Sequence, residues 1–429
     1  MSKEVPQKSV QRWSQAFQCV KSWVYRIVGI FDTPLWAGLL GLVVYLAYAI
    51  HVNPALKASP MDFYNYLADA FLHGQLALRL VPPGSRQDLS VFQNHYYLYW
   101  PPLPAILLMP FVALFGINFS DVLVTLVIAS LNVALVAWLL RLANREKIIH
   151  LTTFQRSTLV LFFAFGTVAF TIAPYGRVWF TDSATGFFFT LLAYLAAIGL
   201  NGKKSFFLTG LAIAAAMMCR NTLLLAGIWP AFYLIEKTRE KGWKVLAAQG
   251  SFGLLPVFVF GVAYLVYNWA RFGNPLETGA AYQIMNSAWV NNVKTYGYFN
   301  LHYVKTNFYY HYIFYPFPET GETLQGGSLF LLSPVFFAAF IGMVKGKPRL
   351  SVLFMILTIV IVDLPILFFF GDGWFQFGPR YTLDFTVPLL LLTAIGIEWV
   401  PDWLLVLLGL ASVVQYHKGM SILNIVWRP

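Results

Sequence analysis

The sequence is poor in charged residues and nearly free of cysteine. Only 11% of its 429 residues are charged and 59% are hydrophobic, whereas about 25% of the residues in a soluble domain are charged. This composition excludes a large soluble core, and repeated apolar runs of roughly 18 or more residues predict a polytopic membrane protein. Cys19 lies in the N-terminal segment and Cys219 in an apolar run, so we expect neither a disulfide nor a cysteine metal cage.

Sequence signatures of several enzyme classes are also missing. No HExxH pair, P-loop or GxGxxG segment in a suitable context occurs. The formal net charge of +11 does not form a basic stripe, because the lysines and arginines occur in short clusters between apolar runs. This arrangement carries information about topology and predicts no nucleic-acid partner.

The basic clusters predict which segments face the cytoplasm. The positive-inside rule assigns five segments to that side: the N-terminus, 141–156, 203–204, 237–244 and 345–349. Residues 1–34 are typical of a basic amphipathic helix on the cytoplasmic leaflet. The next apolar run, 36–52, is not followed by a small-residue cleavage site, so we expect it to be retained as a span.

The remaining polar loops are then extracytoplasmic, and the longest are 53–118 and 270–327. The apolar run 101–116 is short and broken by proline, and a juxtamembrane or re-entrant helix there keeps every basic loop inside. We therefore expect an all-α bundle of about eleven spans, with the N-terminus inside and the C-terminus outside. No repeat or Ser/Gly linker divides residues 35–429, which favours a single membrane domain.

The first outer loop opens with SPMDFYNYLADAF, residues 59–71. Ser59 is a good helix N-cap, the proline after it suits the first helical position, and Asp62 falls at N3 as in a capping box. Helical spacing puts four polar residues on one face: Asp62, Tyr66, Asp69 and His73. An acid in the first turn stabilises a helix by about 0.3–1 kcal/mol, so spacing alone favours capping over catalysis for Asp62.

Three arginines are expected at headgroup depth on the outer side: Arg177, Arg220 and Arg380. A guanidinium can hold a phosphate through two parallel hydrogen bonds. Contact with lipid headgroups, or snorkelling of the side chain to the interface, explains the position of any single one of these arginines equally well. Most predicted spans carry no charge, and the main exception is Asp363, a type of residue that marks the substrate path in a transporter.

Two outer segments are rich in aromatic residues: NHYYLYWPP (94–102) and NFYYHYIFYPFPE (307–319). Interfacial belts of Tyr and Trp account for both segments. Sugar-binding clefts also set aromatic faces beside polar groups, which makes His95 and Tyr97 candidate substrate contacts. The spacing of His95, His302 and His311 matches no metal-binding motif.

In their order along the chain, these features resemble the GT-C glycosyltransferases, multi-span enzymes that use polyprenyl- or dolichyl-phosphate sugars. The likeness is to bacterial relatives of the dolichyl-phosphate-mannose mannosyltransferases and aminoarabinose transferases. Five segments carry it: the first-loop Asp62, the Pro-Pro segment 101–116, YNWARFGNPLETG (267–279), GSLFLLSPVFF (327–337) and GDGWFQFGPRYTLDFTVPLL (371–390). The sequence departs from the family in having Phe63 beside Asp62 where many members have a second acid, and no lysine beside the Pro-Pro motif.

The resemblance implies a GT-C fold in the inner (cytoplasmic) membrane, with juxtamembrane helices in both long loops. It implies a hexosyl- or pentosyltransferase whose partners are membrane lipids, a polyprenyl-phosphate sugar donor and a lipid-linked or envelope acceptor on the extracytoplasmic face. Asp62 would act as general base with Asp69 in reserve, and one or more of the arginines would stabilise the departing phosphate.

The same resemblance bears on cofactors. No dissolved cofactor is required, and a divalent metal, which some relatives bind near the base, is not favoured because Asp62 has no adjacent acid. A lipid or glycolipid transporter stays open as the alternative from another class, with Asp363 as its functional residue. A nonenzymatic scaffold explains the outer polar residues poorly.

Overall fold

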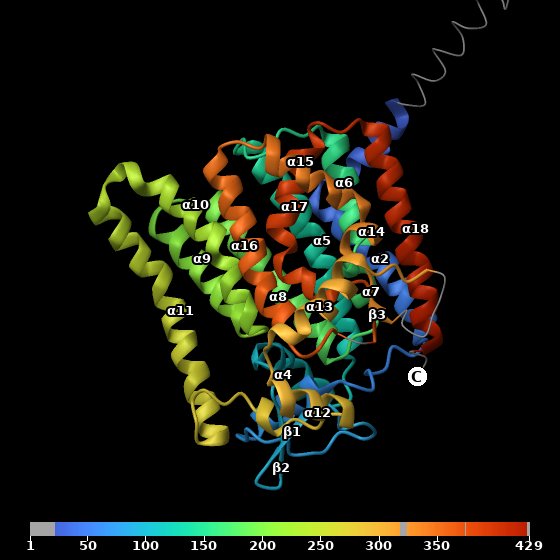
Figure 1. The fold of residues 1–429 in the computed structure, drawn as a ribbon, viewed down its shortest axis with the longest axis vertical. Helices are drawn as coiled ribbons and strands as arrows, with labels where there is room; N and C mark the ends of the chain where they lie inside the picture. Colours follow the sequence, from blue (N-terminus) through green and yellow to red (C-terminus); the bar gives the residue numbers. More distant parts are fainter. Residues whose placement is uncertain (1–21, 318–323, 374, 427–429) are drawn as a thin grey trace, which may run out of the picture.

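The computed structural model describes residues 22–317, 324–373 and 375–426 as a bundle of helices (Figure 1). Within these residues, seven helices are long and apolar enough to cross a membrane. They are α2 (Pro34–Val52), α5 (Asp121–Arg145), α8 (Val178–Gly199), α11 (Trp243–Phe272), α16 (Arg349–Phe368), α17 (Leu383–Ile397) with the preceding turn η7 (Arg380–Thr382), and α18 (Asp402–Val426). Residues 22–29 are helical, and residues 1–21 of the predicted amphipathic segment lie outside the described residues.

Shorter helices complete the bundle. They are η1 (Ile30–Asp32), α6 (Thr153–Phe165), α7 (Val168–Ile172), α9 (Gly202–Met217), η2 (Asn221–Gly227), α10 (Ile228–Thr238), η3 (Arg239–Lys241), α14 (Leu329–Leu332), η6 (Pro334–Phe337) and α15 (Ala338–Lys345). Of these, α6, α9, α10 and α15 lie alongside the long helices (Figure 1). They are too short to count as spans by length, so the figure of about eleven spans remains a prediction.

Burial separates central helices from peripheral ones. In α17, 94% of the most apolar window is buried, compared with 6% in α11. A helix that is apolar on all sides and buried on all sides forms the centre of a bundle, and α17 packs so closely on α15 that a Cβ at Gly396 would lie 1.7 Å from the Ala338 carbonyl oxygen. Helix α11 stands away from the rest and packs mainly on α9 (Figure 1).

Two long connections gather at one end of the bundle, which we call the loop end (Figure 1). The first holds α3 (Phe63–Leu72), the hairpin β1–β2 (Leu89–Phe92 and His95–Leu98) and α4 (Leu103–Phe115). The second holds η4 (Ala280–Tyr282), α12 (Ser287–Tyr296), α13 (Leu301–Phe308), η5 (Tyr309–Ile313) and β3 (Gln325–Gly326), which pairs in parallel with β4 (Gln376–Phe377).

Backbone hydrogen bonds join the two connections. The Ile284 amide donates to Leu89 O at 2.8 Å, and the Asp88 amide donates to Ile284 O at 3.1 Å. The Ser90 hydroxyl donates to Gly279 O at 2.7 Å. The hairpin and the second loop therefore form one unit over the ends of the long helices.

The start of α3 differs from the prediction. The helix begins at Phe63, so Asp62 occupies the N-cap position and makes no side-chain capping bond. Ser59 does not cap α3, because its amide and hydroxyl both donate to the carboxylate of Asp121, at 2.7 Å each. The predicted capping box is wrong, since a partner 62 residues away along the chain competes successfully for Ser59.

Candidate active site

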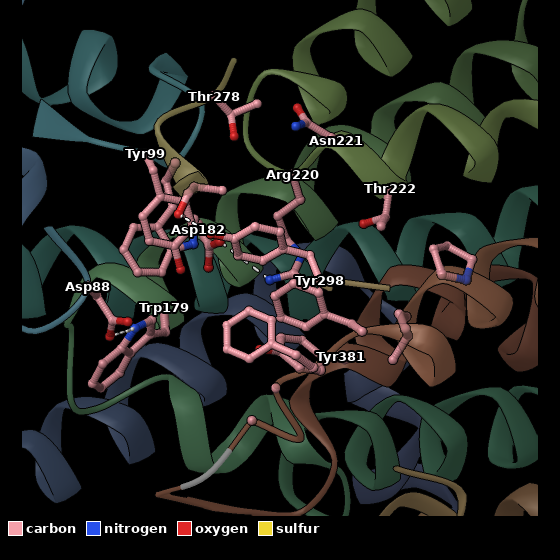
Figure 2. Close-up of a pocket in the computed structure, with 18 of the residues that line it drawn as sticks. Asp88, Tyr99, Trp179, Asp182, Arg220, Asn221, Thr222, Thr278, Tyr298 and Tyr381 are labelled. Carbon is pink, nitrogen blue, oxygen red and sulfur yellow. Dashed lines mark hydrogen bonds and ion pairs between the residues drawn. The ribbon is translucent and has the colours of Figure 1, made fainter. Parts of the chain in front are cut away.

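A cavity of about 440 Å³ opens at the loop end, between the ends of α8, α16 and α17, the turn η2 and the two long connections (Figure 2). Its wall is mainly aromatic: Tyr99, Trp100, Trp179, Trp289, Tyr298, Phe299, Phe369, Phe370 and Tyr381. Four charged side chains also line it: Asp88, Asp182, Arg220 and Arg380. Aromatic faces next to a few charged groups can bind a polar ring and an anion together.

Asp88 reaches the cavity from the residue before β1, where its φ of 73° is unusual for a non-glycine residue. Its carboxylate accepts hydrogen bonds from Trp179 Nε1 at 3.1 Å and from Gln283 Nε2 at 2.8 Å (Figure 2). Burial raises the pKa of Asp88 to about 6, while these two bonds and the charge of Arg380 act in the opposite direction. Asp88 is thus ionised at neutral pH and fixed in orientation, as a general base must be.

Arg220, in the turn before η2, is surrounded by carboxylates. Its Nε lies 2.9 Å from Asp384 Oδ1. Its Nη1 lies 3.4 Å from Asp182 Oδ2 (Figure 2). The Thr222 hydroxyl also donates to Asp384, at 2.6 Å. Three helices thereby meet at one buried ion network, since Asp182 lies in α8, Asp384 lies in the first turn of α17 and Arg220 precedes η2.

Arg380 is held differently, at the start of η7. Its Nη1 donates to Gly373 O at 3.0 Å, and its Nη2 donates to the Tyr381 hydroxyl at 3.3 Å. The guanidinium lies 5.8 Å from the centroid of the Trp179 ring and 4.8 Å from that of Tyr381. Its Nε is buried and has no hydrogen-bond partner among the described residues.

Of the seven residues that the sequence singles out, Arg220 and Arg380 line the cavity, whereas Asp62 and Arg177 do not. Asp62 is buried beside Asp121, and burial together with the charge of that neighbour raises its pKa to about 8. Arg177 donates its amide to Asp121 at 2.8 Å, and burial lowers the pKa of its guanidinium to about 9. These residues form a second polar cluster, separate from the cavity lining.

The other predicted contacts lie outside the cavity lining as well. Asp69 forms a two-pronged ion pair with Arg79, at 2.9 and 3.0 Å. His95 lies at the exposed turn of the hairpin with its Nδ1 2.8 Å from Gln93 O. Tyr97 packs its ring 5.1 Å from that of Phe272.

Sequence reasoning missed Asp182, Asp384 and the specific importance of Asp88. Asp182 lies about one helical turn after Arg177, and Asp384 lies about one helical turn after Arg380. This spacing could have identified both acids as neighbours of the predicted arginines. Asp88 carries no local signal, because its partner Gln283 is 195 residues further along the chain.

Among the described residues, no group of three or more His, Cys, Asp or Glu side chains is arranged to hold a metal. The acids of the cavity are instead bonded to arginine, tryptophan, glutamine and threonine.

Comparison with solved structures gives matches at low sequence identity, each with a TM-score below 0.5. One is ArnT from Cupriavidus metallidurans bound to undecaprenyl phosphate, with 14% identity and a TM-score of 0.47 over 87% of this chain and 62% of that one. Another is the apo oligosaccharyltransferase of Archaeoglobus fulgidus, with 12% identity and a TM-score of 0.42 over 91% of this chain and 56% of that one.

The chain thus spans about three fifths of the length of these structures. At such identities the likeness concerns the fold alone. No family model and no curated protein matches the sequence.

Proposed function

We propose that this protein is a membrane glycosyltransferase that moves a sugar from a polyprenyl-phosphate donor to a hydroxyl of an extracytoplasmic acceptor, with inversion at the anomeric carbon. The observation that carries this proposal is the cavity at the loop end. It combines an aromatic wall, two carboxylates and two guanidiniums at the ends of long apolar helices. A substrate that is part lipid, part phosphate and part sugar matches each of these components.

The location of the charges favours chemistry over transport. Asp88, Asp182, Arg220 and Arg380 all gather at the loop end, whereas a transporter is expected to hold its polar site near the bilayer midplane. The prenyl chain of a donor could lie among the exposed apolar side chains of neighbouring helices while its phosphate reaches the cavity. The loop end is then the extracytoplasmic side, as the distribution of basic segments predicts.

The reaction is a single displacement. The acceptor oxygen forms a bond to the anomeric carbon while the bond from that carbon to the phosphate oxygen breaks. The polyprenyl phosphate departs with the electron pair, and the acceptor proton passes to a carboxylate. A phosphate leaves without protonation, so one base suffices here, unlike the two carboxylates of a glycoside hydrolase.

Asp88 is our candidate for that base, since its carboxylate lines the cavity and its raised pKa of about 6 lies near the operating pH. Asp182 is a weaker candidate because it is fully buried against Arg220. The sequence-based prediction for Asp62 is tested by the same experiment. The guanidiniums that line the cavity would stabilise the charge that develops on the phosphate.

The test is a transfer assay with purified protein in detergent or nanodiscs. It supplies radiolabelled polyprenyl-phosphate sugars and envelope lipid acceptors without any nucleotide sugar. We expect labelled product from the wild type and a loss of about 10²–10⁴-fold in Asp88→Asn. Asp62→Asn should retain more activity than Asp88→Asn, and the reverse order would return the role of base to Asp62.

The transporter alternative makes an opposite prediction for a residue outside the cavity. Asp363 in α16 has a buried Oδ1 without a hydrogen-bond partner in the part of the chain that the structure describes. Movement of an unmodified lipid across vesicle membranes, abolished by Asp363→Asn and unaffected by Asp88→Asn, would refute the enzyme and support the transporter. Transfer that survives in Asp363→Asn would support the enzyme.

A further inference from the structure

A second cavity, of about 500 Å³, lies in the side of the bundle, and its lining comes from α5, α8 and α9. Helices α5 and α9 each pack along α8, so α8 forms the floor of this cavity and the other two helices form its sides. The first turns of α8 line the loop-end cavity, whereas its last three turns line this one. The second cavity, which we call the α5–α8–α9 groove, therefore lies toward the end of the bundle opposite the loop end (Figure 1).

The shape of the groove fits one lipid chain. Every lining residue except Arg145 is apolar. Trp138, Leu142 and Arg145 follow one another at helical spacing on one face of α5, and Trp138 is 51% exposed, so the groove opens to the outside of the bundle. Its floor from Phe189 to Gly199 is about 15 Å long at a rise of about 1.5 Å per residue, and one leaflet contributes about 15 Å of a bilayer core.

The polar end of the groove carries more basic than acidic groups. Arg145 is exposed, and its Nε lies 3.0 Å from Glu146 Oε1. Exposed ion pairs of this kind are weak, so a phosphate can compete for the guanidinium. The charge of Glu146 also acts on Lys237, whose Nζ donates to the carbonyl oxygen of the lining residue Leu200 at 2.7 Å. One carboxylate is thus shared between two bases.

Lys204 adds a third base from the opposite side of the groove. It is exposed in the first turn of α9, one helical turn before the lining residue Leu208 and on the same face. Among the described residues, no carboxylate lies within ion-pair distance of Lys204. Positive charge therefore stands on both sides of the groove at its polar end.

We propose that the α5–α8–α9 groove binds an anionic phospholipid of the leaflet opposite the loop end, with one acyl chain along α8 and its phosphate between Arg145 and Lys204. Basic pockets between membrane helices bind anionic headgroups in this way. Apolar contact alone does not select a ligand inside a bilayer, because every lipid tail offers it, so the headgroup charge sets the preference. The prenyl chain of a donor is a poorer occupant, since its phosphate has to reach the cavity at the other end of α8.

Trp138 allows a direct test, because bromine atoms on an acyl chain quench the fluorescence of a tryptophan that the chain contacts. Purified full-length protein in phosphatidylcholine nanodiscs receives increasing fractions of brominated phosphatidylglycerol or brominated phosphatidylcholine. The wild-type signal minus that of Trp138→Phe isolates Trp138, which we expect to be quenched at a lower fraction of phosphatidylglycerol. Trp269, 60% exposed on α11 and outside the groove lining, is the control and should respond equally to both lipids.

Charge variants test the headgroup contact. Arg145→Gln and Lys204→Gln should each raise the phosphatidylglycerol fraction at half-maximal quenching of Trp138 by about fivefold, the effect of one basic side chain near a membrane surface. Both variants should leave the response to phosphatidylcholine unchanged. Lys347→Gln is the matched control, because Lys347 is exposed before α16 and outside the groove lining, and it should behave as the wild type does. Leu211→Phe narrows the groove without changing its charge and should reduce the maximal quenching.

Four results would overturn the inference. One is equal quenching of Trp138 by the two brominated lipids, and another is an unchanged half-maximal fraction in both charge variants. Displacement of the brominated lipid by polyprenyl phosphate at a lower fraction than by unlabelled phosphatidylglycerol would assign the groove to the donor chain. Absence of quenching by either lipid would mean that a second copy of the chain covers the groove. None of these measurements involves sugar transfer, so each result leaves the proposed function to its own assay.

Discussion

Among single residues, Asp88 offers the sharpest link between structure and rate, because its pKa is raised to about 6. A base acts in its ionised form, so kcat/KM should be level above about pH 7 and fall about tenfold per pH unit below about 6. Gln283→Leu removes the 2.8 Å hydrogen bond that lowers this pKa, so the acid limb should move to higher pH. A pH–rate profile measures both effects. If the acid limb of the pH–rate profile stays at the same pH in Gln283→Leu, Asp88 is not the general base.

Asp62 supports a separate prediction about stability. Burial and the charge of Asp121 raise its pKa from 3.8 to about 8, so the folded chain holds this proton more tightly than the unfolded chain does. Stability is then lost as the pH rises from about 4 to about 8. Asp62→Asn cannot ionise and should show a flatter dependence of the unfolding midpoint on pH, measured by thermal unfolding in detergent. An equally steep dependence in the variant would contradict this account.

The sequence could identify some residues of the cavity and not others, for a physical reason. Arg220 and Arg380 stand out because a charged side chain at the end of an apolar run is costly and therefore conspicuous. Asp88 lies in a polar loop where an acid is ordinary, and only its contacts with Trp179 and Gln283 distinguish it. Long-range contacts of this kind are not encoded in local spacing.

Among the elements, the contact between α9 and α11 depends on two glycines. A Cβ on Gly210 would lie 1.9 Å from the carbonyl oxygen of Gly253, so the helices touch backbone to backbone. Gly210→Ala should force α11 away from α9 and destabilise the protein by about 1–3 kcal/mol. Gly261→Ala, on α11 with nothing within 4 Å of the added Cβ, is the matched control. Equal unfolding midpoints for the two variants would show that the contact is unimportant.

One short helix was predicted from its apolar length and its prolines, whereas the number of spans stays a prediction. The apolar run 101–116 forms the short helix α4 at the loop end, where Pro104 lies in its first turn and Gly116 ends it with a φ of 82°. The start of α3 was misassigned because Asp121 takes the hydroxyl of Ser59. Local rules hold until a tertiary partner offers a buried polar group a stronger bond.

For the whole molecule, the arrangement of charge predicts orientation in the membrane. The basic segments 141–156, 237–244 and 345–349 should be cytoplasmic, which makes the loop end with its cavity extracytoplasmic. In a background with Cys19→Ser and Cys219→Ala, we expect Ser85→Cys to react with a membrane-impermeant maleimide in intact cells. Lys241→Cys should react only after permeabilisation. Ser85 and Lys241 are both exposed, on the first loop and at η3.

This experiment also constrains the chemistry. A polyprenyl-phosphate donor is needed only where nucleotide sugars do not reach, so an extracytoplasmic cavity and a lipid-linked donor depend on each other. If Lys241→Cys reacts in intact cells while Ser85→Cys does not, the cavity faces the cytoplasm. A cytoplasmic nucleotide sugar could then serve as donor. The observed order of labelling therefore decides whether the cavity can take its sugar from a lipid-linked donor.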